Sequence, residues 1–209
     1  MALSFNNNRE FFHSNHDWYV ESVRKPLTEL AYELTDTIEL IDPNLERRPE
    51  KVVSRINRDL RFTKDKSPYR DYMWIGYEAQ SENKNRLPGF YVGISAVGVE
   101  WGMGIYEENR PLMNANRQRL ENDSAALDGI TAELSEHFRL EASAFKRMKL
   151  PEGLNGIAAM WYPVRTFTFV NESKDMELIT SGSLGGYLKR ELLRLKPAYD
   201  YFSGLIPIE

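Results

Sequence analysis

Hydrophobic and polar positions change their spacing several times along the chain, which divides it into helical and extended segments. Apolar residues recur every three or four positions from Asn6 to Ile41, and this spacing predicts helix. The stripe expected to face a core consists of Leu27, Leu30, Ala31, Leu34, Ile38 and Ile41. Pro26 predicts either the first turn of a second helix or a kink in one long helix. Asp42 and Pro43 predict the end of this helical region.

A second group of segments predicts an antiparallel sheet. Three runs rich in aromatic and β-branched residues favour strands, and they are residues 72–79, 89–96 and 99–106. Val97 and Gly98 separate the last two runs, and so short a connection predicts a tight hairpin. Residues 165–172 alternate like a further strand, and a short strand is expected within residues 138–153.

Helical spacing returns after the central strands. Residues 110–136 predict helix, with Pro111 near its start and Ser124 as an internal cap. Residues 185–202 predict a C-terminal helix with an apolar stripe. The whole pattern predicts one α+β domain over residues 1–209, with N-terminal helices, a central and mainly antiparallel sheet, and further helices including the C-terminal one.

Composition narrows the classes of protein that fit this pattern. The 209 residues include no cysteine, which excludes disulfides, thiolate metal sites and iron–sulfur clusters. No run of about eighteen apolar residues occurs, and no signal-peptide pattern begins the chain, so we expect a cytoplasmic protein without membrane contact. The formal net charge of −4 makes nonspecific binding of nucleic acid an unfavoured function.

Charge is concentrated in one short segment, from Arg55 to Arg70. Its basic residues are Arg55, Arg58, Arg61, Lys64, Lys66 and Arg70, and its acidic residues are Asp59 and Asp65. The segment therefore carries a net charge of +4, while the rest of the chain carries −8. This local reversal of sign is the strongest electrostatic feature of the sequence.

The basic segment predicts a site for a small anionic ligand that bears phosphate or carboxylate. Arginine binds such groups through two parallel hydrogen bonds, and lysine adds a mobile charge. If the segment is extended, alternate residues share one polar face, and these are Arg55, Asn57, Asp59 and Arg61. The predicted ligand-binding residues are Arg55, Asn57, Arg58, Arg61, Lys64 and Lys66. The candidates for acid–base catalysis are Asp59 and Glu100, which alternates with apolar neighbours in the strand 99–106.

Two other functions fit the same residues. The segment can be an internal ion-pair network in a structural or protein-interaction domain. A nucleic-acid module would place the aromatic residues of the sheet beside the basic segment for base stacking, although core packing is the simpler role for them. His13 and His16 lie three residues apart, which is too little to predict a metal site. No motif indicates a cofactor, an oligomeric state or a particular reaction, so whether the protein is an enzyme stays open.

Several stretches resemble a known family. They are "NNREFF" followed by Tyr19, then "SRINRDLRFTKDKSPYRDYM" and "PGFYVGIS". Together they resemble the conserved hypothetical family called domain of unknown function 2461, from Asn6 to about Phe202. Family members usually carry an apolar helical turn before the Asn pair and a tryptophan where Phe11 stands. The resemblance implies a cytosolic α+β protein and carries no assigned activity.

Overall fold

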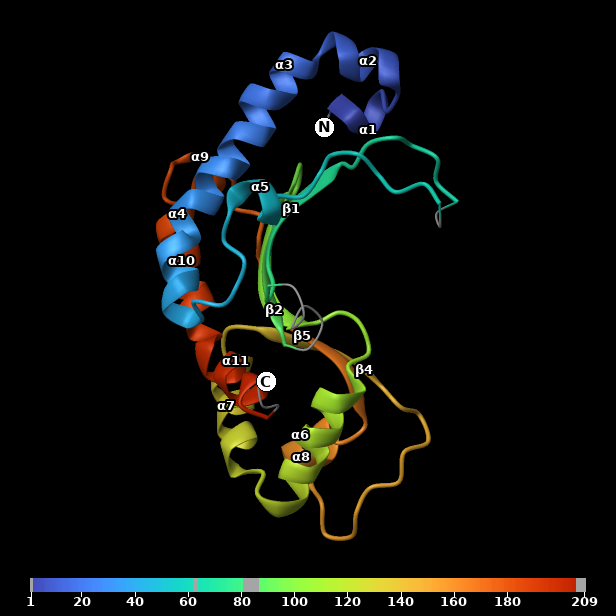
Figure 1. Cartoon of the computed structure of the whole chain (residues 1–209), viewed down its shortest axis with the longest axis vertical. Coiled ribbons are helices and arrows are strands. Elements are labelled where there is room, and N and C mark those ends of the chain that lie inside the picture. The colour runs from blue at the N-terminus through green and yellow to red at the C-terminus, as the bar shows by residue number, and fades with distance from the viewer. Residues whose placement is uncertain (1, 62–63, 81–86, 206–209) are drawn as a thin grey trace.

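A five-stranded antiparallel sheet forms the centre of the molecule (Figure 1). The computed structural model describes residues 2–61, 64–80 and 87–205. The strands, in their order across the sheet, are β1 (Tyr72–Tyr77), β2 (Gly89–Ser95), β3 (Gly98–Ile105), β5 (Val164–Ser173) and β4 (Arg139–Ala144). All neighbouring strands pair antiparallel, which confirms the predicted α+β class and its mainly antiparallel sheet.

Helices cover one face of this sheet. The two that lie along β1 to β3 are α4 (Lys25–Ile41) and α10 (Leu184–Arg194). The remaining helices are α1 (Ala2–Phe5), α2 (Arg9–Ser14), α3 (His16–Tyr19), η1 (Val20–Arg24), α5 (Pro49–Val52), α6 (Arg110–Asn122), α7 (Ala125–Ser135), α8 (Gly156–Trp161), α9 (Met176–Thr180) and α11 (Lys196–Ser203). Figure 1 shows that none of these described helices lies against the opposite face of β1 to β3, which we call the open face.

Alternation along the strands decides which side chains enter the core. In β1 the buried positions are Met73, Ile75 and Tyr77, and the positions between them are half-buried. The predicted helical stripe of α4 meets this face, and all six of its residues are buried. Buried residues of the sheet and the helices form a single cluster. Fully burying one such side chain contributes roughly 1.5–3 kcal/mol, so this cluster supplies the main stabilising term.

Pro26 stands in the first turn of α4, as one of the two predicted alternatives had it, but α4 is not an isolated helix. Instead α3, η1 and α4 follow one another, and η1 is a short π-helix that ends just before the proline. In this turn the Lys25 amide donates to the Val20 carbonyl, five residues back. A proline ring collides with the carbonyl four residues before it, here that of Ser22, and the wider π-turn relieves this clash.

The C-terminal helical region differs from the prediction in one respect. The expected helix over residues 185–202 is divided into α10 and α11, with Leu195 between them. Pro197 stands in the first turn of α11, a position that suits proline, so the chain starts a new helix there. The hairpin after β2 is confirmed, but its turn consists of Ala96 and Val97, because Gly98 already pairs with Ser95.

The basic segment lies in an extended ribbon that prolongs β1 beyond the sheet. We call residues 53–61 and 64–71 the basic arm. Its two sides are joined by backbone hydrogen bonds from Arg58 to Pro68 (2.9 Å) and from Arg70 to Ile56 (2.8 Å). Figure 1 shows the arm reaching away from the helix-covered side of the molecule. The expected extended conformation of the segment is therefore present. The two sides of the arm pair through an isolated β-bridge between Asn57 and Tyr69 and not through a continuous ladder of hydrogen bonds.

Glycine in β3 allows a close approach between neighbouring strands. A Cβ atom at Gly104 would collide with the backbone carbonyl oxygen of Phe167 on β5. In contrast, nothing lies within 4 Å of a Cβ atom placed on Gly129, which is an exposed residue in the middle of α7. The two glycines therefore have opposite structural requirements.

We expect Gly104→Ala to lower the free energy of unfolding by roughly 1–3 kcal/mol, because the backbone of β5 must move. Gly129→Ala should raise it by about 0.5–1 kcal/mol, because alanine loses less entropy in a helix. Urea denaturation of both variants checks this pair. A Gly104→Ala protein as stable as the wild type would show that the strands do not require the close approach.

Candidate functional site

Within the basic arm, arginines and carboxylates pair with one another. Arg61 donates to Asp59 through Nη2, at 2.7 Å from Oδ2. Arg58 binds Asp65 and lies 3.9 Å from Asp71. The predicted polar face does turn to solvent, since Arg55, Asn57, Asp59 and Arg61 are all exposed. These pairs neutralise part of the charge that the sequence concentrates in this segment.

The other predicted ligand-binding residues have different surroundings. Lys66 donates to the carbonyl of Leu60 (3.0 Å), and the carbonyl of Asn57 accepts from Arg70 Nε (3.3 Å). Arg55 and Lys64 make no hydrogen bond or ion pair with any residue that the structure describes. The arm thus brings the predicted residues close in space. Arg55 and Lys64 are the two of them whose charged groups pair with no described residue.

The two acid–base candidates lie in different places. The Arg61 guanidinium holds the pKa of Asp59 at about 2, far below its ordinary value, so Asp59 is a weak base near neutral pH. Glu100 lies on β3, two strands from β1, where its carboxylate accepts a hydrogen bond from the Tyr91 hydroxyl (2.8 Å). Strand β2 thus lies between Glu100 and the strand that continues the arm with Asp59.

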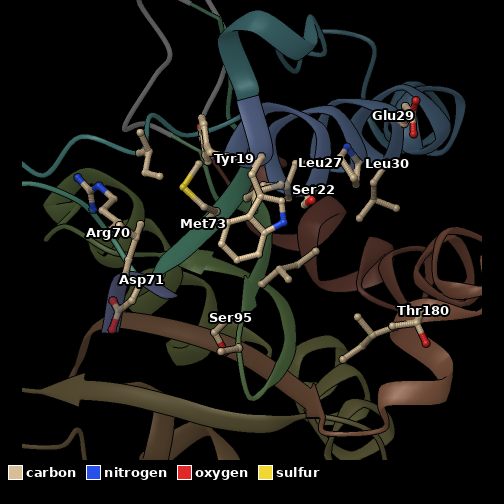
Figure 2. A pocket seen from close by; sticks show the side chains of 18 of the residues that line it. Tyr19, Ser22, Leu27, Glu29, Leu30, Arg70, Asp71, Met73, Ser95 and Thr180 are labelled. Carbon is tan, nitrogen blue, oxygen red and sulfur yellow. The ribbon is translucent and has the colours of Figure 1, made fainter. Parts of the chain in front are cut away.

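A pocket of about 790 Å³ lies beside the base of the arm, on the helix-covered side of the sheet (Figure 2). One wall is a helical stripe that runs through α3, η1 and α4 and consists of Asn15, Trp18, Tyr19, Ser22, Val23, Pro26, Leu27 and Leu30. The ends of β1 and β2 form a second wall through Met73, Ile94 and Ser95. The segment joining α9 to α10 closes the pocket through Ile179, Thr180 and Leu184.

Most of the lining is apolar, and the charged groups lie apart from one another. Figure 2 shows Arg70 and Asp71 of the arm on one side and Glu29 of α4 on the other. A second carboxylate on α4, Glu33, also lines the pocket and lies 3.5 Å from Lys189. The pocket is therefore amphipathic, with Arg70 and Asp71 of the arm at one end and carboxylates of α4 at the other.

The π-turn contributes directly to this pocket. Ser22 and Val23 belong to η1, and both line the cavity. Tyr19 precedes the turn, and burial raises the pKa of its hydroxyl although Arg24 opposes the rise. Single π-turns inside α-helices occur frequently at functional sites, because they displace the helix and redirect side chains.

Sequence reasoning missed this pocket for a physical reason. A periodic apolar stripe predicts that one face of a helix is buried. It cannot show along how much of the helix the sheet packs against that face. The stripe of α4 meets the sheet, whereas Trp18 in α3 remains 57% exposed. A usable signal was present in the proline of the stripe, which marks where the regular helix is interrupted.

The histidines do not gather at a site. No group of three histidine, aspartate or glutamate side chains in the described part of the chain is arranged to hold a metal ion. His16 lies 3.8 Å from Asp17, and both side chains are exposed. Among the same described residues, none of the helices has the length and apolar character needed to cross a bilayer.

Comparison with known proteins identifies the family. The model of the conserved hypothetical protein family DUF2461 matches residues 1–201, so the chain belongs to this family. Searches of curated proteins and of solved structures return no match to the chain. The predicted resemblance is thus confirmed.

We expect the Asp59 carboxyl group to titrate with a pKa of about 2 in a side-chain NMR experiment. In Arg61→Gln its pKa should rise towards the ordinary value of 3.8, because the hydrogen-bonding cation is gone. Asp65 is the control, since the pKa of its carboxyl is lowered first by hydrogen bonds from Ser67. If the Asp59 titration is the same in Arg61→Gln, the ion pair does not form in solution.

Proposed function

We propose that this protein binds a small amphipathic acid, with its apolar body in the pocket and its carboxylate or phosphate at the end beside the basic arm. The observation that supports this most directly is the pocket itself, whose apolar walls end at Arg70. Its volume of about 790 Å³ lies within the range of roughly 300–1,000 Å³ that is typical of small-molecule sites.

The apolar body would contact side chains that already belong to the core. Leu27, Leu30, Met73 and Leu184 are each buried, yet each also lines the pocket. Because these residues are held by α4, β1 and α10, the surface they offer is preformed. A ligand that removes this surface from water gains roughly 25 cal/mol for each Å² of apolar area buried.

Charge supports one orientation of the acid. At the arm end, Arg70 and Asp71 both line the pocket. The Arg70 guanidinium makes no ion pair with a described carboxylate, donates to the Asn57 carbonyl and lies 4.6 Å from the centroid of the Trp74 ring. Glu29 and Glu33 at the other end disfavour a second negative charge there. The predicted anion-binding arm would therefore receive the acidic group.

The proposal is limited to binding. Serine and threonine side chains of the pocket, such as Thr180 and Ser95, form hydrogen bonds with backbone groups of their own segments. Among the described residues of the lining, no nucleophile lies within hydrogen-bonding distance of a base, and such a pair is the usual mark of covalent catalysis.

We expect dodecanoate to bind in isothermal titration calorimetry, and to bind more tightly than dodecylamine of the same chain length. Ser22→Phe should weaken dodecanoate binding at least tenfold, because the ring occupies the pocket. Glu21→Phe is the matched control, since Glu21 is exposed on the same π-turn and does not line the pocket. Equal affinity of Ser22→Phe and the wild type for dodecanoate would disprove binding in the pocket.

The position of the acidic group is tested in the same titrations. Arg70→Gln should weaken dodecanoate about fivefold and leave neutral dodecanol unchanged, whereas the distant Arg110→Gln should change neither. If Arg70→Gln weakens both compounds equally, or if dodecylamine binds as tightly as dodecanoate, the assignment of the acidic group to the arm is wrong.

The ion pairs inside the arm also favour a structural role for Arg58. Its side chain is 24% exposed and serves both Asp65 and Asp71. We expect Arg58→Ala to lower the free energy of unfolding by about 1 kcal/mol, because two carboxylates lose their cation. Lys64→Ala removes an exposed cation from the same arm and should leave the melting temperature nearly unchanged in a thermal melt. Equal melting temperatures for Arg58→Ala and Lys64→Ala would contradict the structural role.

A further inference from the structure

The open face of the sheet carries a second group of residues that the pocket does not use. We call Tyr72, Trp74, Tyr91 and Tyr106 the aromatic platform. The rings form two pairs, with centroids 5.9 Å apart for Tyr72 and Trp74 and 5.7 Å apart for Tyr91 and Tyr106. Tyr106 is 55% exposed, and the other three are half-buried. These side chains are therefore accessible to a ligand from the side that has no described helices.

Glycines form the floor beneath the platform. A Cβ atom at Gly93 would collide with the Tyr72 hydroxyl, and one at Gly102 would lie 2.9 Å from Cε1 of the Tyr91 ring. The two rings thus lie across neighbouring strands at positions where any side chain would displace them. This arrangement holds the rings close to the backbone of the sheet.

The platform has a carboxylate at its centre. The Tyr91 hydroxyl donates to Glu100, and Glu100 pairs across the strands with Gly93, over which Tyr72 lies. The charge of Glu100 contributes to raising the pKa of Tyr72 and of Tyr106, in addition to the effect of burial. Tyr72, Tyr91 and Tyr106 therefore all lie near the same carboxylate.

Further negative charge lies next to Glu100. It stands directly opposite Glu172 on β5, and like charges in this position destabilise a sheet. Lys174 approaches Glu172 to 3.8 Å. A hydrogen bond with Glu141 raises the pKa of the nearby Arg139, and the charges of Glu172 and Glu100 both add to this rise. No basic side chain in the described part of the chain lies within 4.0 Å of the Glu100 carboxylate. A cation bound beside Glu100 would relieve this repulsion.

The protein already places one of its own cations on the platform. The Arg70 guanidinium lies 4.6 Å from the centroid of the Trp74 ring. Cations are attracted to the negative face of an aromatic ring, and tryptophan is the strongest partner. Because Arg70 already lies over Trp74, the rings that remain for a further cation are those of Tyr72, Tyr91 and Tyr106.

We propose that the aromatic platform binds a small organic cation, with its ammonium or guanidinium group among the rings and Glu100 as its counter-ion. Aromatic rings combined with carboxylates form the usual recognition site for quaternary ammonium groups. An anion or a nucleic-acid phosphate would meet the repulsion of Glu100 and Glu172 instead. This proposal does not depend on the amphipathic acid, because Glu100 and the four rings of the platform do not line the pocket.

The test compares choline with 3,3-dimethylbutan-1-ol, its uncharged isostere, in titrations of the full chain followed by ligand-observed NMR. We expect choline to bind at least fivefold more tightly than the alcohol. Glu100→Gln should weaken choline at least fivefold and leave the alcohol unchanged, because the glutamine keeps the size of the side chain and an acceptor for Tyr91. Tyr106→Leu should weaken choline as well.

Two controls locate the bound cation. Tyr32→Leu removes a tyrosine that is 63% exposed on α4, outside the platform, and should have no effect. Ser22→Phe should also leave choline binding unchanged, because it alters only the pocket. Equal binding of choline and the alcohol, an unchanged affinity in Glu100→Gln, or loss of choline binding in Ser22→Phe would each overturn the proposal.

Discussion

Burial of one face of a five-stranded sheet against α4 and α10 is the constraint on which the rest of this structure depends. Side chains alternate across a strand, so each strand that sends residues into this core must present the residues between them to the other side. In β1 the core takes Met73, Ile75 and Tyr77, and the other side receives Tyr72 and Trp74. The covered face supplies stability, while the open face is left for glycines, aromatic rings and Glu100.

The pocket results from a mismatch in length between the N-terminal helices and the sheet. The apolar stripe of α4 continues through η1 into α3, beyond the region that the strands can cover. Side chains there remain apolar without being fully packed. A cavity of about 790 Å³ is left between the N-terminal helices, the arm, the ends of β1 and β2, and the helices α9 and α10. Pro26 adds to this effect, because its missing N–H and its ring favour the wider π-turn beside the cavity.

Electrostatics divides the two candidate sites by sign. The arm brings arginines to the base of the pocket, and its internal ion pairs with Asp59 and Asp65 leave other cations without a described partner. The open face instead gathers carboxylates among aromatic rings. A protein with a small net charge can therefore offer a basic end to one ligand and an acidic surface to another.

The sequence by itself determined the fold class, the helical stripe of α4, the central strands and the unusual charge of the arm, because these depend on local periodicity and composition. It also carried the family resemblance, which the match over residues 1–201 confirms. Only the tertiary structure decided that Arg61 pairs with Asp59, that the stripe near Trp18 borders a cavity, and that the Tyr91 hydroxyl of β2 binds the Glu100 carboxylate of β3. Such contacts depend on how side chains and distant segments meet in space, and neither periodicity nor spacing contains the information on which of them meet.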